Sequence, residues 1–371
     1  MGKRPTVYDV AERAGVSIAT VSFAFRRPDQ VREETRLAVL EAAKDIGYIP
    51  SASARGLARG RTGALGLHSF DFLLEHAQRP AGPPRPETEE SALDIAQQAI
   101  PWEDTNEDSL SDARAFPLYV DEVQRGFELE CKLQGRPLLL SSGTGSAASL
   151  AETAGWVDGL AIFPTVAAPK IPESISLGLP VVLFSSAGEG DRYHRVIADN
   201  VAGMRDLVTH LVEEHRPTGF GFVGGLTVSD FKERFDSFRQ TLHSLGQPVP
   251  DDVLDDSTSV DGSPFSGLIQ AIEGGRLPGA LVCASDQIAL MVLDLLARHD
   301  ISVPGDVLVT GFDGIIAGQL STPTLTTVRQ PMESMGRVAA RLLIAETSTP
   351  HGSPLTIRLG TRLMRRHSCG C

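Results

Sequence analysis

The first fifty residues alternate apolar and polar positions at helical spacing in three short stretches, over 7–14, 17–25 and 32–46. Thr6 begins the first stretch with an S/T-x-x-D/E pattern, which is typical of a helix start. Gly15 separates the first two stretches by a short turn, which is the layout of a helix-turn-helix. Each stretch carries an apolar stripe, so we expect three short helices around one small core.

From residue 63 the pattern changes to short apolar runs, typical of buried strands, that alternate with amphipathic segments long enough for helices. The expected strands are 64–67, 137–140, 159–163, 180–184, 219–223, 280–284 and 307–312. The expected helices lie near 121–133, 201–214, 231–245, 266–273 and 287–298. Strands that alternate with helices predict repeated βαβ units, and hence an α/β body with parallel sheets.

Two polar stretches interrupt these regions. Residues 51–62 are rich in Ser, Ala, Gly and Arg, which is the composition of a linker. Residues 71–112 carry eleven Asp and Glu against two Arg, together with five prolines. Because such a segment cannot bury enough apolar surface to order itself, we expect an acidic, largely flexible insertion whose role the sequence does not indicate.

The formal net charge of −13 argues against a nucleic-acid partner if it is taken over the whole chain of 371 residues. Its distribution changes that picture. Residues 1–62 hold eleven Lys and Arg against seven Asp and Glu, a net charge of +4, whereas the remaining residues carry −17. The sequence therefore predicts a small basic head on a large acidic body, and a basic head is the usual footprint of nucleic-acid binding.

No apolar run approaches the ~18 residues that a membrane span needs, and the first residues lack the apolar stretch of a signal peptide. We therefore expect a cytoplasmic protein with no membrane association.

The nine histidines are scattered, and the sequence has no Gly-x-Ser-x-Gly, His-Glu-x-x-His or Walker motif. Gly219–Gly224 spells G-x-G-x-x-G, but inside an apolar strand rather than after it. We expect no cofactor, no catalytic residues and no enzyme.

The four cysteines make no disulfide framework in so long a chain. Cys131 and Cys283 lie in apolar stretches and are expected in the core. Cys369-Gly-Cys371 with His367 offers at most three ligands, whereas a structural zinc ion takes four. We therefore expect no metal site, and a frayed chain end there instead.

Several blocks of sequence occur at a characteristic spacing. The head contains Tyr8-Asp-Val-Ala-Glu-Arg-Ala-Gly-Val-Ser-Ile-Ala-Thr-Val-Ser22, followed by Gly47-Tyr-Ile-Pro50 and Ala54-Arg-Gly-Leu57. The body contains Asp199-Asn200, Ala284-Ser-Asp-Gln-Ile-Ala289, Val309-Thr-Gly-Phe-Asp313 and Leu325-Thr-Thr-Val-Arg-Gln-Pro331. Together these blocks resemble the lactose-repressor/galactose-repressor (LacI/GalR) family of bacterial transcription regulators, over nearly the whole chain apart from 71–112. The resemblance implies an N-terminal three-helix helix-turn-helix DNA-binding domain and a two-subdomain body similar to periplasmic binding proteins, with parallel sheets.

The head is expected to contact DNA. In a helix-turn-helix the second helix enters the major groove with its N-terminal residues against base edges, which nominates Ile18, Ala19 and Phe23. Such apolar side chains can press on a thymine methyl group but cannot make the bidentate contacts of Arg to guanine. The resemblance implies that the DNA backbone is held by Thr6, Tyr8, Ser17, Thr20, Ser22, Arg32 and Thr35. Thr6 and Ser17 have the alternative role of capping helices.

Residues 51–60 resemble the hinge helix that family members fold when two copies meet on operator DNA. Leu57 would be the apolar wedge between base steps of the minor groove, with the small Ala54 beside it and Arg55 near phosphates. The alternative is a plain flexible linker, since Gly56 and Gly60 weaken a helix.

The resemblance also implies a small effector in the cleft between the two subdomains of the body. Arg234, Ser285 and Asp313 match family positions that grip its hydroxyl groups, and Asp313 follows a strand end, where open α/β sheets bind ligands. Family members commonly have Asn where Ser285 stands, and a hydroxyl makes fewer hydrogen bonds than a carboxamide, which weakens sugar recognition. Alternatively, Arg234 forms a structural ion pair and Asp313 caps the next helix.

These expectations define a domain plan. A DNA-binding domain covers 1–50, a hinge covers 51–62, and an effector-binding and dimerisation domain covers 63–371. Subdomain 1 takes about 63–196 and 329–351, and subdomain 2 about 197–328 and 352–371, with crossovers near 184–199 and 325–330.

The expected function is that of a homodimeric repressor that binds palindromic double-stranded operator DNA under the control of a small molecule such as a sugar. Two alternatives stay open. One is a regulator that has lost small-molecule binding and responds to a protein partner, and the other is an enzyme acting on a small metabolite. The sequence names neither the effector, the operator nor the regulated genes, nor does it say whether the effector releases or promotes DNA binding.

Overall fold

The computed structural model describes residues 5–26, 30–48, 61–70, 118–143, 147–163, 177–184, 192–256, 265–348 and 352–371. The hinge segment 51–60 and the acidic insertion 71–112 lie outside these residues. The chain divides into two compact units. One contains residues 1–64 together with 156–158, and the other contains the rest of the body.

The head consists of α1 (Val7–Ala14), α2 (Ile18–Arg26) and α3 (Glu33–Asp45). The expected start of α1 is confirmed, because the Asp9 carboxylate accepts hydrogen bonds from the backbone N–H and the hydroxyl of Thr6, both at 2.6 Å. Gly15 ends α1 with a φ of 64°, a left-handed conformation that costs glycine no steric strain. The core of the head draws on all three helices through Val10, Ala11, Val21, Ala24, Val39, Ala42 and Ala43. The predicted helix-turn-helix is confirmed.

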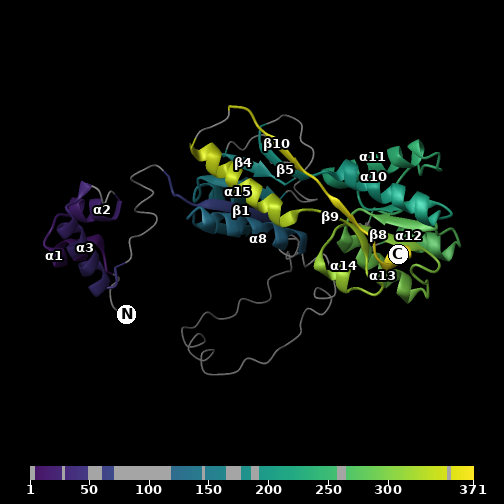
Figure 1. The fold of residues 1–371 in the computed structure, drawn as a ribbon, viewed down its shortest axis with the longest axis horizontal. Coiled ribbons are helices and arrows are strands. Elements are labelled where there is room, and N and C mark those ends of the chain that lie inside the picture. Colours follow the sequence, from purple (N-terminus) through teal and green to yellow (C-terminus); the bar gives the residue numbers. More distant parts are fainter. Residues whose placement is uncertain are drawn as a thin grey trace, which may run out of the picture. The chain divides into compact units, whose positions relative to one another are not determined.

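The first lobe of the body is built on a six-stranded sheet (Figure 1). Its strands are β1 (Leu65–Phe70), β2 (Leu138–Gly143), β3 (Gly159–Phe163), β4 (Val181–Leu183), β5 (His194–Ala198) and β10 (Thr356–Leu359), in the order β10-β5-β4-β3-β1-β2. All of its neighbours pair in parallel. Every residue of β3, β4 and β5 is buried, as expected of parallel strands that are covered on both faces. Its helices are α8 (Leu118–Leu133), α9 (Ala147–Ala154) and α15 (Met332–Ser348).

The second lobe has a five-stranded sheet in the order β11-β9-β8-β7-β6. Its strands are β6 (Phe220–Val223), β7 (Ala280–Cys283), β8 (Leu308–Asp313), β9 (Thr326–Arg329) and β11 (Arg362–Met364), parallel except that β11 runs antiparallel to β9. Its helices are α10 (Asn200–His210), the π-helical turn η3 (Leu211–His215), α11 (Ser229–Ser244), α12 (Ser266–Glu273), α13 (Asp286–Arg298), α14 (Ile316–Leu320) and the 3-10 turn η4 (His367–Cys369). The α/β fold class is confirmed.

Two crossovers differ from the expected plan because they contain strands. The segments 184–199 and 325–330 include β5 and β9, which the sequence analysis missed because polar residues interrupt their apolar pattern. His194, Arg195 and Thr326 are all buried. The backbone pairs Thr356 of β10 with Arg195 of β5, so β10 belongs to the first sheet, whereas 352–371 was assigned entirely to subdomain 2. The chain therefore crosses between the lobes a third time, after β10.

Two glycines allow α8 and α15 to pack closely in the first lobe. A Cβ atom on Gly126 would lie 1.9 Å from the carbonyl oxygen of Glu333, and one on Gly336 would lie 2.0 Å from that of Val123. Any side chain at either position would push the two helices apart.

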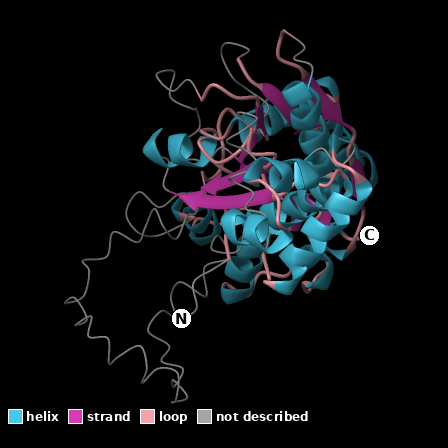
Figure 2. Cartoon of the chain, turned by 90° about the vertical axis from the view of Figure 1, so that its left-hand side faces the viewer, coloured by secondary structure: helices cyan, strands magenta, loops and turns pink. Residues whose placement is uncertain are grey.

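Figure 2 shows the strands of the body surrounded by helices. Among the described residues, no helix combines the length and the apolar character that crossing a bilayer requires.

Candidate functional site

The second helix of the head, α2, has one buried and one exposed face. Val21 and Ala24 are 0% and 4% exposed in the core of the head, whereas the apolar side chains of Ile18 and Phe23 are 41% and 44% exposed. Ala19 is also exposed. Large apolar side chains left in water on a small domain are candidates for an interaction surface. The three predicted base readers thus share the outer face of one helix.

The residues predicted to contact the DNA backbone carry hydroxyl groups or, in one case, a guanidinium. Ser17 caps α2, because its Oγ accepts a hydrogen bond from the backbone N–H of Thr20 at 3.1 Å. Ser17 is nevertheless exposed, and Thr6 is half-buried, so their capping role leaves both side chains at the surface. Tyr8 is 67% exposed. Arg32 is exposed, and Thr20, Ser22 and Thr35 are half-buried.

The segment between the head and β1 is described only at its end. The Asp158 carboxylate accepts hydrogen bonds from the backbone N–H groups of Thr62 and Gly63, at 2.6 and 2.8 Å, and from the Thr62 hydroxyl at 2.9 Å. Three bonds to one carboxylate fix the backbone just before β1 begins. The predicted DNA contacts Ala54, Arg55 and Leu57 lie outside the described residues.

Arg234 is the centre of a buried polar cluster in the second lobe. It lies on α11, and its side chain is 5% exposed. Its Nε donates to Oδ1 of Asn200 at 2.9 Å and its Nη1 to the carbonyl oxygen of Ala284 at 2.6 Å. Nη1 also lies 3.6 Å from the Asp313 carboxylate, and the guanidinium stacks 3.9 Å from the ring centroid of Phe312. The structure thus brings Arg234 and Asp313 together as an ion pair.

Asp313 lies at the carboxyl end of β8 with a φ of 139°, which is rare for a residue other than glycine. Its Oδ1 accepts a hydrogen bond from Nε2 of Gln330 at 2.6 Å. Burial raises the pKa of this carboxyl against the lowering effect of Arg234. The alternative that Asp313 caps the next helix is wrong, because the residue that precedes α14 is Ile315, whose N–H is bound by Asp286.

Ser285 is the N-cap of α13, and its Oγ accepts a hydrogen bond from the backbone N–H of Ile288 at 3.2 Å. It follows Ala284, whose carbonyl binds Arg234, so it borders the polar cluster while its hydroxyl serves the helix. The polar cluster consists of Asn200, Arg234, Asp313 and Gln330.

The first lobe contributes aromatic side chains that the sequence analysis did not assign to the site. Burial raises the pKa of Tyr119 on α8, and the negative charges of Asp230 and Asp313 in the second lobe raise it further. Its ring lies edge-on to Phe163, with centroids 6.2 Å apart, and Phe163 stacks on Phe184 at 4.5 Å. The signal in the sequence was the point where the acidic insertion ends, at Phe116-Pro-Leu-Tyr119.

Asn200 and Gln330 were also missed as members of the site. The Asn200 amide donates to Asp230 and Glu233, both at 2.8 Å, while its oxygen accepts from Arg234. An amide that bridges acidic groups and a guanidinium holds the arginine in one orientation. The sequence signal for Asn200 was the position of the Asp199-Asn200 block at the start of a helix.

The carboxyl-terminal tail is ordered, so the expectation of a frayed end is wrong. Ser368 and Cys369 are fully buried. The Ser368 hydroxyl donates to the carbonyl oxygen of Val309 at 2.5 Å and accepts from the N–H of Thr326 at 2.9 Å. These bonds join the tail to β8 and β9.

Two family profiles match the chain. The profile of bacterial regulatory proteins of the lacI family matches residues 6–51, and that of the periplasmic binding protein-like domain matches residues 208–369. The HTH-type transcriptional repressor PurR of Actinobacillus pleuropneumoniae serotype 3 (strain JL03) is 24% identical over 98% of both chains. The HTH-type transcriptional regulator RegA of Clostridium saccharobutylicum is 28% identical over 91% of both chains. The HTH-type transcriptional regulator CelR of Thermobifida fusca is 27% identical over 99% of this chain and 98% of its own.

Solved structures share the fold over the same length. The lac repressor dimer bound to operator and the anti-inducer ONPF has a TM-score of 0.74 and 20% identity, with 99% of both chains covered. The complex of the transcriptional regulator CelR with cellobiose has a TM-score of 0.60 and 23% identity, covering 98% of this chain and 100% of that one.

Proposed function

Since this chain belongs to the lactose-repressor/galactose-repressor family of DNA-binding transcriptional regulators, we propose that it represses transcription by binding operator DNA as a homodimer. In this proposal a small molecule held between the two lobes of the body controls the binding. The observation that carries the proposal is the outer face of α2. There Ile18, Ala19 and Phe23 are exposed on a helix-turn-helix that does not need them for its own core.

The side chains of the head are suited to two kinds of contact. Contacts to the DNA backbone would position the head, and apolar contacts to base edges would read the sequence. Hydroxyl groups and Arg32 at helix starts are suited to phosphate oxygens, because the helix N-terminus adds partial positive charge. Ile18 and Phe23 offer contact to thymine methyl groups. A head with a net charge of only +4 on an acidic body gains little from non-specific attraction, so two heads on a palindromic site are needed for tight binding.

The polar cluster supports binding of a small, hydroxyl-rich effector. Arg234 and Asp313 present a donor and an acceptor at the carboxyl ends of the second-lobe strands, where open α/β sheets bind ligands. Tyr119 and Phe163 add aromatic surface from the first lobe, and such a mixture suits a molecule with apolar faces and polar edges. An effector that contacts both lobes favours one arrangement of them, and it changes operator affinity only as far as it distinguishes the two states.

The relatives belong to a family of DNA-binding regulators, which is not an enzyme family. We propose that the chain itself acts in the cytoplasm without turnover, cofactor or membrane partner. The domain plan of a DNA-binding head, a hinge over 51–62 and a body for effector binding and dimerisation is part of the same proposal.

A second candidate function is a regulator that answers to a protein partner instead of a small molecule. The observation that favours it is the engagement of Arg234, which already donates to Asn200 and Ala284 and pairs with Asp313. These contacts use its Nε and Nη1, so an effector would have to bind through Nη2 or displace one of these partners.

Calorimetry of the full chain against a panel of sugars distinguishes the two functions. Heat of binding that is lost in Asp313→Asn supports the small-molecule regulator. Absence of heat with every sugar, together with operator binding that changes only when a protein partner is added, supports the second.

A further inference from the structure

Four metal-binding side chains converge at the far end of α10 in the second lobe. They are His210, His215, Cys369 and Cys371, and their ligand atoms all lie within 4.8 Å of one another. Nε2 of His210 lies 3.3 Å from Nε2 of His215, 3.6 Å from Sγ of Cys369 and 3.4 Å from Sγ of Cys371. Sγ of Cys371 lies 3.4 Å from Nε2 of His215 and 3.5 Å from Sγ of Cys369.

These separations are those of a tetrahedral ligand set. Zinc binds imidazole nitrogen at about 2.0 Å and thiolate sulfur at about 2.3 Å, so tetrahedral ligand atoms lie roughly 3.3–3.8 Å apart. The five separations given above run from 3.3 to 3.6 Å. These five separations suit one central ion at normal bond lengths, and the remaining pair, His215 and Cys369, lies within 4.8 Å. We propose that His210, His215, Cys369 and Cys371 form a structural zinc site.

The backbone of the helix is adapted to bring the two histidines together. Five residues along an α-helix turn by roughly 500°, which would leave His215 about 140° away from His210 around the axis. The turn η3 is π-helical, and the N–H of Arg216 bonds the carbonyl oxygen of Leu211 five residues back at 3.0 Å. The wider turn brings His215 onto the face of His210, with ring centroids 4.9 Å apart. Such π-helical turns occur frequently at functional sites.

The tail supplies the two sulfur atoms from a tight turn. Gly370 between the cysteines has a φ of 93°, which side chains other than glycine rarely adopt, and its N–H donates to the carbonyl oxygen of His367 at 2.9 Å. A Cβ atom there would lie 3.6 Å from Nδ1 of His215. The turn directs both sulfur atoms toward the histidines, and the buried Ser368 anchors it to the sheet.

Two thiolates with two imidazoles are the ligand set of structural zinc sites. The four protein groups fill all tetrahedral positions, so the site is closed and holds structure rather than activating water. Two thiolates also balance the charge of a divalent cation.

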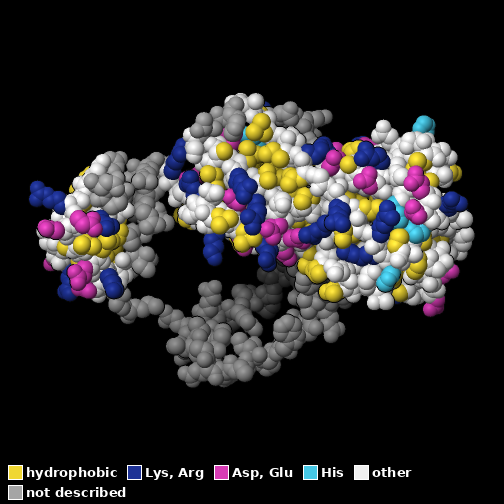
Figure 3. All heavy atoms as spheres, in the orientation of Figure 1, with side chains coloured by type: hydrophobic (Ala, Val, Ile, Leu, Met, Phe, Trp, Pro, Cys, Tyr) yellow, Lys and Arg dark blue, Asp and Glu magenta, His cyan; other side chains and the backbone are white. Residues whose placement is uncertain are grey.

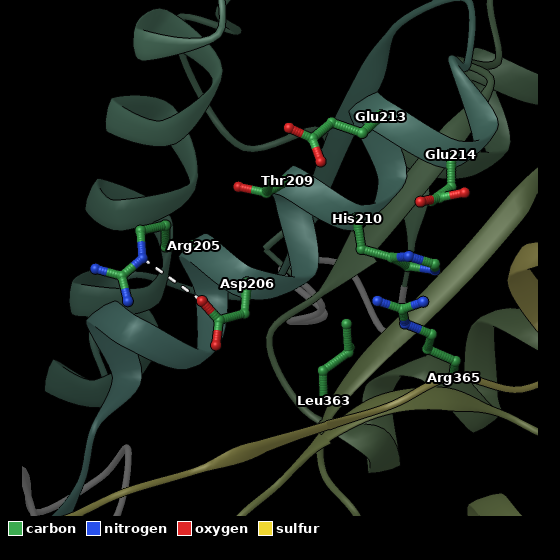
Figure 4. A pocket seen from close by; sticks show the side chains of 8 residues that line it. All are labelled: Arg205, Asp206, Thr209, His210, Glu213, Glu214, Leu363 and Arg365. Atoms are coloured by element: carbon green, nitrogen blue, oxygen red, sulfur yellow. Dashed lines mark ion pairs between the residues drawn. The ribbon is translucent and has the colours of Figure 1, made fainter.

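The site is separate from the polar cluster. Asn200 begins α10 and His210 ends it, so the two sites lie about 15 Å apart along the helix. Figure 4 shows His210 beside Arg365, with Glu213 and Glu214 nearby, in a surface pocket. Figure 3 shows histidine and basic side chains together on the visible face of this lobe. Zinc there would fasten the carboxyl terminus to the helix that presents Asn200 to Arg234.

Zinc content of the purified full chain tests the proposal. The protein is equilibrated with ZnCl₂ under reducing conditions, freed of loose metal by gel filtration, and its zinc is measured by atomic absorption. Cys371→Ser and His215→Asn each remove one ligand, and Cys371 is the exposed last residue, so its replacement spares the core. His367→Asn is the matched control, because His367 is an exposed histidine of the same tail.

One zinc ion per chain is expected in the native protein and in His367→Asn, with affinity at least about tenfold lower in the two ligand variants. Substituted Co²⁺ is expected to show the visible absorption of tetrahedral coordination and a thiolate charge-transfer band. Chelation is expected to lower the melting temperature of the native protein and of His367→Asn, but not that of the two ligand variants. The proposal is overturned if native protein with free thiols takes up no zinc, if the ligand variants bind as the control does, or if Cys369 and Cys371 form a disulfide that persists under the reducing conditions.

Discussion

The guanidinium of Arg329 joins the two lobes of the body by binding both carboxylate oxygens of Glu122. Nη1 donates to Oε2 at 2.9 Å, and Nη2 donates to Oε1. Arg329 ends β9 in the second lobe, whereas Glu122 lies on α8 in the first. Nη1 also donates to the carbonyl oxygen of Gly314 at 2.8 Å, one residue after Asp313. A bidentate pair of this kind fixes orientation as well as distance, so it couples the arrangement of the lobes to the backbone beside the polar cluster.

Glu122→Gln removes the charge of this pair and should loosen the contact between the lobes. Because both side chains are about a third exposed, we expect a small effect, with amide exchange over 314–330 faster by about two- to fivefold. Hydrogen-exchange mass spectrometry measures it. Glu128→Gln, on the exposed face of the same helix, is the control, and equal exchange in both variants would contradict the coupling.

Arg234→Leu should destabilise the protein strongly, because it leaves the buried Asp313 carboxylate and the Asn200 oxygen without their cationic partner. Breaking one side of a buried ion pair costs about 3–5 kcal/mol in the free energy of unfolding. Urea denaturation followed by circular dichroism gives this free energy. Arg205→Ala, at a side chain 60% exposed, should change it by less than about 0.5 kcal/mol. Similar values for the two variants would show that Arg234 is not the centre of the cluster.

Asp313 should make stability depend on pH in a way that Asp313→Asn removes. Burial raises its pKa in the folded protein above the value near 3.9 of an unfolded chain. Between these two values the folded state holds the proton that the unfolded state has released, so stability contributed by this group falls as pH rises through that window and then stays level. The free energy of unfolding of the native protein, taken relative to that of Asp313→Asn, should therefore fall as pH rises from 4 through this window. A difference independent of pH would contradict the burial of this carboxyl.

Phe23→Arg should change base preference without unfolding the head. Phe23 is 44% exposed and is not part of the core of the head, and an arginine in the major groove favours guanine by about 1–3 kcal/mol through a bidentate contact. Selection of bound sequences from a random DNA pool should show guanine gained at one position of each half-site. Leu37→Ala, at an exposed apolar position of α3, should leave the preference as it was. An unaltered preference in Phe23→Arg would remove this residue from the reading surface.

Much of the fold could be predicted because the apolar pattern of a buried strand or an amphipathic helix lies within a few neighbouring residues. The strand at 159–163 and the helices at 7–14 and 266–273 have the expected bounds, since each is bordered by a clear turn or cap signal. By contrast, β5 contains the buried polar residues His194 and Arg195, whose partners come from elsewhere in the fold and leave no local pattern. The placement of β10 depends on its pairing with β5, more than 150 residues away in sequence.

The candidate sites divide in the same way. The outer face of α2 could be predicted because one helix determines it. Asn200 and Gln330 meet Arg234 and Asp313 only through the folding of the second lobe, and Tyr119 comes from the first lobe, so spacing in the sequence does not reveal them. The sequence analysis considered Cys369 and Cys371 as metal ligands with His367 but missed His210 and His215, because His210 and Cys369 lie on segments 159 residues apart that only the folded lobe brings together.

The proposed function requires that the heads of two chains bind palindromic operator DNA through α2. Selection of fragments from the organism's own genome by the purified full chain at low salt measures this binding. We expect enriched fragments that share an inverted repeat, complexes that contain two chains in analytical ultracentrifugation, and weaker binding by Arg32→Ala with a smaller dependence on salt. Recovery of no fragment above the genomic background, with and without cell extract, would contradict the account.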